Sequence, residues 1–387
     1  MRAEIHDSAD ALAGLRAQWR DLESRALEPN AYLSARFVLP ALACLPASAP
    51  VWAVSVHEGA GSGGPLCALG LFQACAPRAL FPVPHAQVYT TVHSFLGGLL
   101  VDAQTARPAL HAMLDGLCRR TGGLRLHRMS ADGPTARLLR SVLAERGATW
   151  HEEVRTERAC IVAAAEGAGR WRAHASPSRL RHHERQRRKL AELGRTSWHY
   201  LRGDDVRDST IDTFIALEHA GWKGAEGTSL ASDARQERFF RRMICEFRPD
   251  GDVFFTELRL RDEVIASTCN LRSGGDGFAF KVCFDPRYAK FSPGLLNELG
   301  FLEALDQAVD HFRFIDSGAE PGSFIEGLWP DRLSLLSGSI ALGHMARVAA
   351  RAAKHLWLLR RRLMPAPARS PAGMESPVPG RSEGAAA

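Results

Sequence analysis

Residues 253–316 read VFFTELRLRDEVIASTCNLRSGGDGFAFKVCFDPRYAKFSPGLLNELGFLEALDQAVDHFRFID, and this stretch decides the fold. Three apolar runs, 253–260, 264–271 and 278–285, are separated by a short charged segment and by the glycine-rich segment 273–277. Turn segments of this kind close hairpins, so the stretch predicts three consecutive antiparallel strands, followed by a helix and a last strand that ends at Asp316.

The third run places large apolar side chains at every second position: Phe278, Phe280, Val282 and Phe284. Because successive side chains of a strand point to opposite faces, we expect these four to share one face, with Lys281 and Asp285 on the other. The two charged residues could flank a substrate, or they could form an ion pair on the surface of the sheet.

A helix should begin at Ser292-Pro293-Gly294. Serine is a good N-cap, proline is preferred at the first helical position, and glycine lets another group approach the backbone closely. Apolar residues then recur at helical spacing at Leu295, Leu299, Leu302, Leu305, Val309 and Phe312. An open helix N-terminus suits a phosphate or pyrophosphate, although an ordinary capped helix would carry the same residues.

Length and composition indicate a globular protein that could contain two cores. The chain has 387 residues, of which 45% are apolar and 24% are charged. It has no apolar, uncharged window long enough to span a bilayer, and MRAEIHDSAD has no signal-peptide core. Eight cysteines without a CxxC pair indicate reduced thiols in the cytoplasm, and no metal site is expected.

The first half alternates expected helices (8–27, 31–45, 106–120, 135–146) with expected strands (51–56, 66–73, 95–101, 124–129, 160–164), and 76–94 should be irregular. The second half repeats this order with helices 178–193, 209–220 and 233–247, strand 196–201 and the stretch 253–316; segment 221–229 should be a loop. The pattern predicts an α/β fold of two tandem domains, 1–168 and 169–340, followed by a basic amphipathic helix over 341–364 and a disordered tail over 365–387.

Glu218 and His219 end one expected helix, and Gly221 terminates it before Trp222 and Lys223. A carboxylate or imidazole at this point could accept the proton of an attacking amine or hydroxyl, and the indole could wall a substrate. A glycine cap with a tryptophan packed beneath it is an equally simple interpretation. Asp316 could line a cleft at the end of its strand, or it could form an Asx turn.

Two segments are rich in basic residues. Segment 179–189 could contact nucleic acid or anionic lipid, but it lacks interleaved aromatic residues, so a solvated helix face is favoured and a nucleic-acid partner is not expected. Segment 341–363 could lie on an anionic membrane surface, which would place the protein at the inner face of the membrane, or it could pack on its own domain.

The chain resembles the GNAT-superfamily acetyltransferases of the CelD/BcsL type, which are linked to polysaccharide biosynthesis and related to the FemAB aminoacyl transferases. Over about residues 170–335 the resemblance is carried by Glu218…Gly221-Trp222-Lys223-Gly224, Phe280-Lys281, Asp285-Pro286-Arg287-Tyr288, Phe291-Ser292-Pro293-Gly294-Leu295-Leu296 and Asp316-Ser317-Gly318. The first half is similar to a degenerate GNAT-like domain.

The resemblance implies two tandem GNAT-like domains, each a mixed, mostly antiparallel sheet flanked by helices. It implies acyl-CoA, expected to be acetyl-CoA, as donor, with its pyrophosphate at Ser292, Pro293, Gly294 and Leu295. Glu218, Lys281 and Asp316 would be catalytic, with Glu218 as the base, and Trp222, Lys223, Asp285 and Tyr288 would bind a sugar or cell-envelope precursor. That small-molecule or glycan acceptor would attack the thioester directly, through nitrogen or oxygen.

Many family members carry an aromatic–lysine pair after the last strand, where this chain has Ser323-Phe324-Ile325-Glu326. This departure leaves two further hypotheses. One is an aminoacyl-tRNA-dependent ligase of the FemAB kind, and the other is a non-catalytic assembly protein at the membrane surface.

Overall fold

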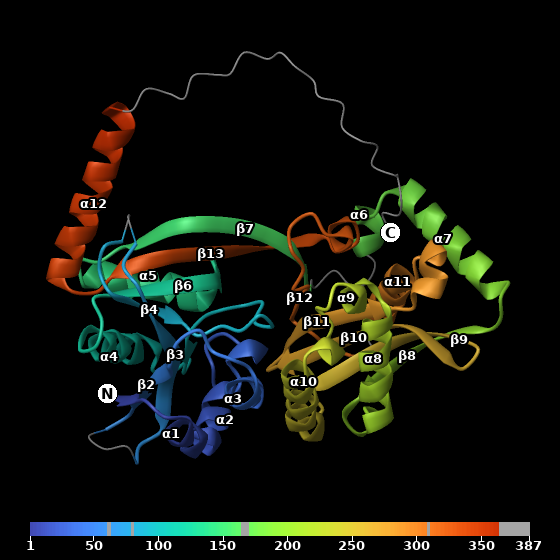
Figure 1. Cartoon of the computed structure of the whole chain (residues 1–387), viewed down its shortest axis with the longest axis horizontal. Helices are drawn as coiled ribbons and strands as arrows, with labels where there is room; N and C mark the ends of the chain where they lie inside the picture. Colours follow the sequence, from blue (N-terminus) through green and yellow to red (C-terminus); the bar gives the residue numbers. More distant parts are fainter. Residues whose placement is uncertain (60–62, 79–80, 164–169, 308–309, 364–387) are drawn as a thin grey trace.

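The structure is a computed structural model that describes residues 1–59, 63–78, 81–163, 170–307 and 310–363. One mixed sheet of thirteen strands runs through the whole described chain, with helices packed on it (Figure 1). The predicted α/β fold, a mixed sheet flanked by helices, is therefore confirmed. No described helix is both long enough and apolar enough to cross a bilayer. The expected tail over 365–387 lies outside the described residues.

The first half contains β1 (Arg2–His6), α1 (Ala9–Gly14), α2 (Arg16–Ser24), α3 (Ala35–Cys44), β2 (Val51–His57), β3 (Leu66–Cys75), β4 (His85–Val88), β5 (Leu100–Val101), α4 (Ala106–Cys118), β6 (Gly123–Ser130), α5 (Pro134–Glu145) and β7 (Trp150–Val162). The second half contains α6 (Arg170–His174), α7 (Pro177–Ala191), β8 (Thr196–Arg202), α8 (Asp208–Ala220), α9 (Trp222–Ala225), α10 (Ala234–Phe247), β9 (Val253–Leu260), β10 (Glu263–Ser273), β11 (Asp276–Phe284), η5 (Pro286–Phe291), α11 (Pro293–Asp306), β12 (Phe314–Asp316), η6 (Phe324–Gly327), β13 (Asp331–Ala341) and α12 (His344–Leu363).

The strand pairing repeats between the two halves. β1, β2, β3 and β4 are antiparallel neighbours, and β4 pairs in parallel with β6. In the same way β8, β9, β10 and β11 are antiparallel neighbours, and β11 pairs in parallel with β12. In each half a helix, α4 or α11, lies between the parallel partners in sequence. This topology supports the repeat that the order of elements predicted.

The two halves share their central strands. β13 follows the second half in sequence, yet it lies between β6 and β7 of the first half, while β7 pairs on its other edge with β12. The sequence prediction placed a strand only at 160–164 and none at 331–341, because a strand held by long-range pairing need not carry a strong local signal. The division at residues 168 and 169 stays a prediction.

A β-bulge changes the faces of β11. Cys269 of β10 is opposite Lys281 whereas the next residue, Asn270, is opposite Ala279, so Phe280 is the extra residue. An extra residue inverts the alternation beyond it. Phe278 and Phe280 pack in the core that lies against α8 and α10, but Val282 and Phe284 point toward α11. The expectation that all four share one face is therefore wrong.

Other local expectations also differ from the structure. α11 ends at Asp306 instead of continuing to Phe312, whose ring packs against Phe254 with the ring centroids 5.5 Å apart. The segment expected to be irregular includes β4, and the expected loop after Gly221 includes the short helix α9. Short elements such as these depend on tertiary partners more than on local pattern.

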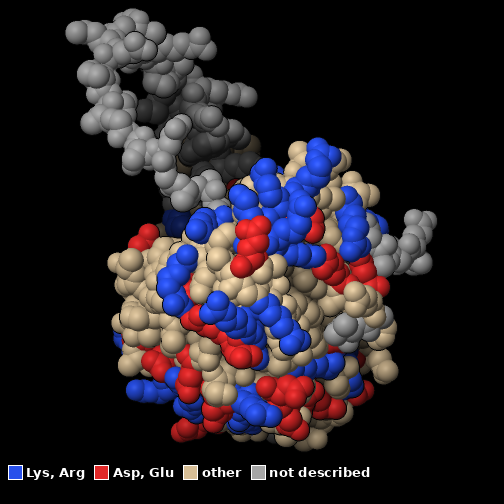
Figure 2. Space-filling view, turned by 90° about the vertical axis from the view of Figure 1, so that its right-hand side faces the viewer, with Lys and Arg blue, Asp and Glu red and all other residues tan. Residues whose placement is uncertain are grey.

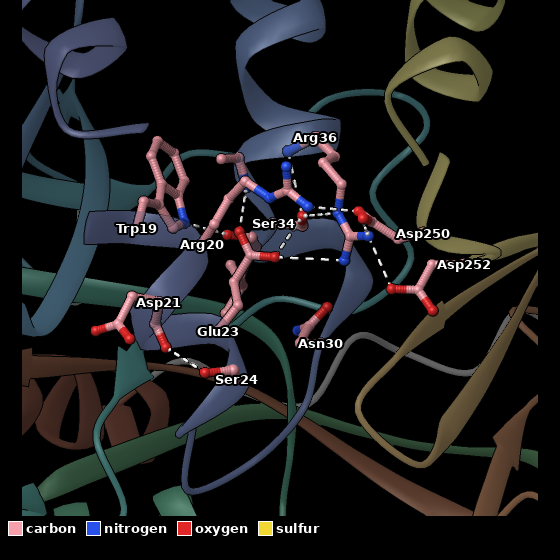
Figure 3. A network of polar contacts seen from close by, with 12 residues as sticks. Trp19, Arg20, Asp21, Glu23, Ser24, Asn30, Ser34, Arg36, Asp250 and Asp252 are labelled. Carbon is pink, nitrogen blue, oxygen red and sulfur yellow. Dashed lines mark hydrogen bonds and ion pairs between the residues drawn. The ribbon is translucent and has the colours of Figure 1, made fainter. Parts of the chain in front are cut away.

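The halves are joined by one apolar core and by a buried ionic network. Arg36 of α3 is only 6% exposed, and its guanidinium contacts the carboxylates of Asp250 (2.9 Å) and Asp252 (2.7 Å), just before β9. Glu23 of α2 approaches the same guanidinium at 3.5 Å and accepts one hydrogen bond from the Ser34 hydroxyl at 2.8 Å (Figure 3). Because the buried guanidinium pairs with carboxylates of both halves, it helps to fix the position of one half relative to the other.

Candidate active site

A cavity of about 450 Å³ lies in the second half. Its lining comes from the end of α8, from α9, from the last residues of β11 and from the start of α11. Most of the lining is apolar, and the side chains of Glu218 and Lys223 supply charge at one side. An apolar cavity with a few convergent polar groups is the usual form of a ligand site.

The cavity follows an open edge of β11. β12 pairs with β11 only over three residues, from Asp276 opposite Phe314 to Phe278 opposite Asp316. The chain then turns at Gly318, which has a left-handed φ of 62° and approaches the carbonyl of Ala279 so closely that a Cβ would lie 2.6 Å from its oxygen. The Ala279 carbonyl accepts a hydrogen bond from the Tyr32 hydroxyl at 3.3 Å. Among the described residues no strand pairs with this edge of β11 beyond Phe278, and an exposed strand edge is a place where an extended ligand can bind.

Three charged side chains meet beside the cavity, and two of them, Glu218 and Lys223, belong to its lining. Glu218 Oε1 accepts hydrogen bonds from Lys281 Nζ at 3.1 Å and from Lys223 Nζ at 3.2 Å. Glu218 Oε2 accepts one from the backbone amide of Leu230 at 2.8 Å. The Glu218 side chain is 1% exposed, whereas those of Lys281 and Lys223 are 10% and 22% exposed. The bulge at Phe280 is what turns Lys281 toward Glu218.

Burial alone would raise the pKa of the Glu218 carboxyl, but Lys281, Lys223 and the Leu230 amide outweigh it and hold the pKa below its usual value. Burial lowers the pKa of Lys281, and the attraction of Glu218 only partly opposes this. The carboxylate is therefore ionised at neutral pH, the state that a general base needs, although its low pKa makes it a weak proton acceptor. The cluster as a whole carries a net positive charge.

The start of α11 closes the other end of the cavity. Ser292 occupies the predicted N-cap position, but it has left-handed dihedral angles (φ 53°, ψ 54°) and its side chain makes no cap hydrogen bond. Pro293 has no amide hydrogen, and the amides of Leu295 and Leu296 donate to the Ser292 carbonyl at 3.1 and 3.0 Å. Gly294 is buried and lies next to the side chains of Val282 and Phe284, which line the same cavity. The helix N-terminus still presents its positive dipole end to this space.

Two exposed aromatic side chains stand at the cavity. Trp222 is 59% exposed, and the ammonium of Lys223 lies 5.9 Å from its ring centroid. Phe324 of η6 is 47% exposed and lines the same cavity. Phe324 was not predicted as a site residue, because it is far from the others in sequence. The one sequence feature that could have indicated Phe324 is its place in segment 323–326, which departs from the family pattern.

The structure places four predicted site residues outside the cavity lining. Lys281 contacts the lining residue Glu218 but does not line the cavity itself. Asp316 is 1% exposed and forms an ion pair with Arg158 of β7, so it links the two halves. Asp285 caps η5 through the Arg287 amide at 2.8 Å and also pairs with the Arg287 guanidinium. The Tyr288 ring lies beneath that guanidinium, 5.5 Å from it.

His93 of the first half approaches the charged cluster. Its ring stacks on Phe239 at a centroid distance of 5.3 Å, and among the described residues its Nε2 has no hydrogen-bond partner. Burial, with a contribution from Lys281, lowers the pKa of His93 to about 3, so the imidazole is neutral. No sequence motif singled out His93.

Cys283 lines the cavity but is not suited to be a nucleophile. Burial raises the pKa of its thiol far above the ordinary value, and its Sγ faces the carbonyl oxygens of Ser267 and Phe214 at 3.6 and 3.8 Å. Because the thiolate is the reactive form, a covalent intermediate on Cys283 is disfavoured.

The equivalent edge in the first half is covered. There the Gly97 amide donates to the carbonyl of Arg128 near the end of β6 at 3.0 Å. Asn30 holds the same segment through the carbonyls of Leu96 and Gly97, at 3.3 Å each. In the first half this segment therefore fills the space beside β6, whereas the corresponding space between β11 and β12 of the second half is open.

A comparison with protein families finds a match that lies in the second half of the chain. Residues 177–321 match the model of the family described as "Acetyltransferase (GNAT) domain". The second half is therefore similar to a GNAT domain over this range. Every cavity-lining residue except Phe324 falls inside the matched range. The matched range also includes the charged cluster and the start of α11, whereas β13, which pairs with the first half, lies beyond it. No curated protein matches the chain.

Two solved structures are similar to the whole chain in fold. The crystal structure of FemX is 9% identical, with a TM-score of 0.53, and the match covers 88% of this chain and 96% of that one. The C-terminal domain of a putative lysylphosphatidylglycerol synthetase from Agrobacterium fabrum is 11% identical, with a TM-score of 0.51, covering 89% and 96%. At these identities the similarity concerns the fold alone.

Proposed function

We propose that the protein is an acyl-CoA-dependent N- or O-acyltransferase of the CelD/BcsL type, with acetyl-CoA as the expected donor and a sugar or cell-envelope polysaccharide precursor as the acceptor. One observation carries this proposal. A single cavity joins an open strand edge, a helix N-terminus and a buried carboxylate with two lysines.

The donor half of the cavity fits an acyl-pantetheine chain. The free edge of β11 can hydrogen-bond the amides of that chain, and the side chains of Val282, Phe284 and Leu295 provide apolar walls. The pyrophosphate would lie at the start of α11, whose residues Ser292 to Leu295 line the cavity.

The charged cluster would serve the acceptor. The acceptor nitrogen or oxygen attacks the thioester carbonyl carbon, the carbon–sulfur bond breaks, and the acceptor proton passes to Glu218 and on to the leaving thiolate. The ammonium groups of Lys281 and Lys223 would stabilise the oxyanion or hold an anionic acceptor. Trp222 and Phe324 would wall the acceptor entrance.

The test is calorimetric titration of the full-length protein with acetyl-CoA and with longer acyl-CoAs. Gly294→Glu places a carboxylate where the pyrophosphate is proposed, and Gly294→Ala is the matched control. An alanine Cβ would meet Phe284 Cδ1 at 3.5 Å and Val282 Cγ2 at 4.0 Å, which is ordinary contact. We expect wild type and Gly294→Ala to bind and Gly294→Glu not to bind. Folded wild type that binds no acyl-CoA would refute the proposal.

An aminoacyl-tRNA-dependent ligase is the second candidate. It is favoured by the exposed arginines of α7, among them Arg181, Arg185 and Arg188. Figure 2 views the molecule from the right-hand side of Figure 1, and Lys and Arg side chains gather on the upper part of that surface. The fold similarity to FemX leaves this candidate open. Binding of tRNA that weakens steeply with salt, together with no binding of acyl-CoA, would favour it over the first.

A further inference from the structure

One helix carries a positive charge that equals the net charge of the whole chain. Segment 344–363, which is α12, has six Lys or Arg residues (347, 351, 354, 360, 361, 362) and no Asp or Glu. The whole chain has 49 Lys and Arg against 43 Asp and Glu, so subtracting these six leaves 43 against 43. The formal charge of +6 is therefore equal to the charge of α12 alone, and the rest of the sequence is balanced.

The same helix exposes an apolar row. Met345 is 78% exposed, Val348 is 48% exposed and Leu356 is 62% exposed, and Ala352 between them is also exposed. Spacings of three, four and four residues place these side chains on one side of a helix. In the sequence the spacing continues at Leu359 and Leu363. Exposed apolar side chains that gather in a row, unlike single ones, indicate an interaction surface.

α12 is attached to the protein by a different side. Ala346 and Ala350 are buried against Phe81 and Ala341, and Arg347 Nη1 donates to the Arg146 carbonyl at 3.2 Å. Beyond this contact the helix projects away from the sheet, at the end of the molecule opposite α11 (Figure 1). The helix thus has a row that faces the protein, a basic row that includes Arg351, and an apolar row that faces outward.

We propose that α12 binds an anionic lipid bilayer, lying in the plane of the membrane surface. The row of Met345, Val348, Ala352 and Leu356 enters the boundary between headgroups and acyl chains, and the basic residues contact anionic headgroups. A solvated charged helix would not need the apolar row, and a purely apolar docking site would not need six positive charges. The two features together match an interfacial amphipathic helix. This proposal is independent of the proposed acyl transfer.

The experiment is co-sedimentation of the full-length protein with vesicles of phosphatidylcholine plus phosphatidylglycerol, and with vesicles of phosphatidylcholine alone. Val348→Glu/Leu356→Glu removes the apolar row. The matched control is Val154→Glu/Leu193→Glu, the same changes at side chains that are 53% and 42% exposed elsewhere. Arg351→Gln tests the charge. Circular dichroism and the melting temperature of each variant check folding.

We expect binding to the anionic vesicles only. The double variant of α12 should lose at least about tenfold in partitioning, since two buried aliphatic side chains are removed from the interface. Arg351→Gln should lose about fivefold, and the control variant should bind as wild type does. The proposal is overturned if wild type does not bind anionic vesicles, or if the double variant and the control bind equally.

Nucleic acid is the other polyanion that a basic helix could bind, and the same proteins are therefore titrated with single-stranded RNA. RNA binding that depends on Arg351 but not on Val348 and Leu356, without vesicle binding, would overturn the membrane assignment. Vesicle binding that persists when RNA is present in excess would support it.

Discussion

Glu298 should make the stability of the protein depend on pH in a direction opposite to that of most carboxylates. It lies on α11, its residue is 8% exposed, and its Oε1 accepts a hydrogen bond from Trp329 Nε1 at 2.9 Å. Burial raises the pKa of Glu298 from 4.5 to about 7, and the Trp329 hydrogen bond opposes this only in part. Since one pKa unit is worth about 1.4 kcal/mol, the penalty for ionising this group in the folded state is about 3 kcal/mol.

The sign follows from the raised pKa of the folded state. Below about pH 4.5 the carboxyl is protonated in both states and there is no penalty. Between 4.5 and about 7 the unfolded chain releases the proton and the folded one retains it, so stability falls as pH rises. Above about 7 the full penalty is present. Glu298→Gln removes it and keeps an acceptor for the Trp329 indole.

Urea unfolding at pH 5 and pH 8 is the assay. We expect Glu298→Gln to be more stable than wild type by about 3 kcal/mol at pH 8 and by less than about 1 kcal/mol at pH 5. The control is Glu303→Gln on the same helix, whose carboxylate pairs with Arg187 and is 32% exposed; it should change stability by less than about 1 kcal/mol at either pH. A Glu298→Gln effect that is equal at the two pH values would refute the reasoning.

Three further predictions concern the site and the junction between the halves. Glu218→Gln should lower the rate of CoA release with acceptor by about 100-fold or more while acyl-CoA still binds; an unchanged rate would exclude a role as base. Trp222→Ala should weaken acceptor binding without lowering the melting temperature, because the side chain is 59% exposed; a large loss of stability would contradict this. Arg36→Met should destabilise the protein to urea by about 3–5 kcal/mol, because the buried carboxylate of Glu23 and its neighbours lose their cation. The control Arg20→Met, at a 44% exposed side chain, should cost less than about 1 kcal/mol, and equal effects would contradict the network.

Much of the second half could be predicted from sequence because its signals are local. Apolar runs and a glycine-rich turn predict the strands of 253–285. The segment Ser292-Pro293-Gly294 predicts the start of α11, which begins at Pro293 in the structure. The family resemblance, and not the local pattern, brought Glu218, Trp222, Lys223 and the start of α11 into one proposed site, and the structure places them around one cavity.

The sequence by itself determined the longer helices and the strands of 253–285, because hydrophobic period, turn residues and helix-start residues act over a few positions. Only the tertiary structure decided what those segments contact. The bulge at Phe280 turns Lys281 toward Glu218, a partner 63 residues away, and Asp316 pairs with Arg158 instead of facing the cavity. β13 leaves its own half and pairs with β6 and β7. Each of these outcomes depends on long-range contacts, whose free energy is gained only when distant segments meet, and so no local pattern contains them.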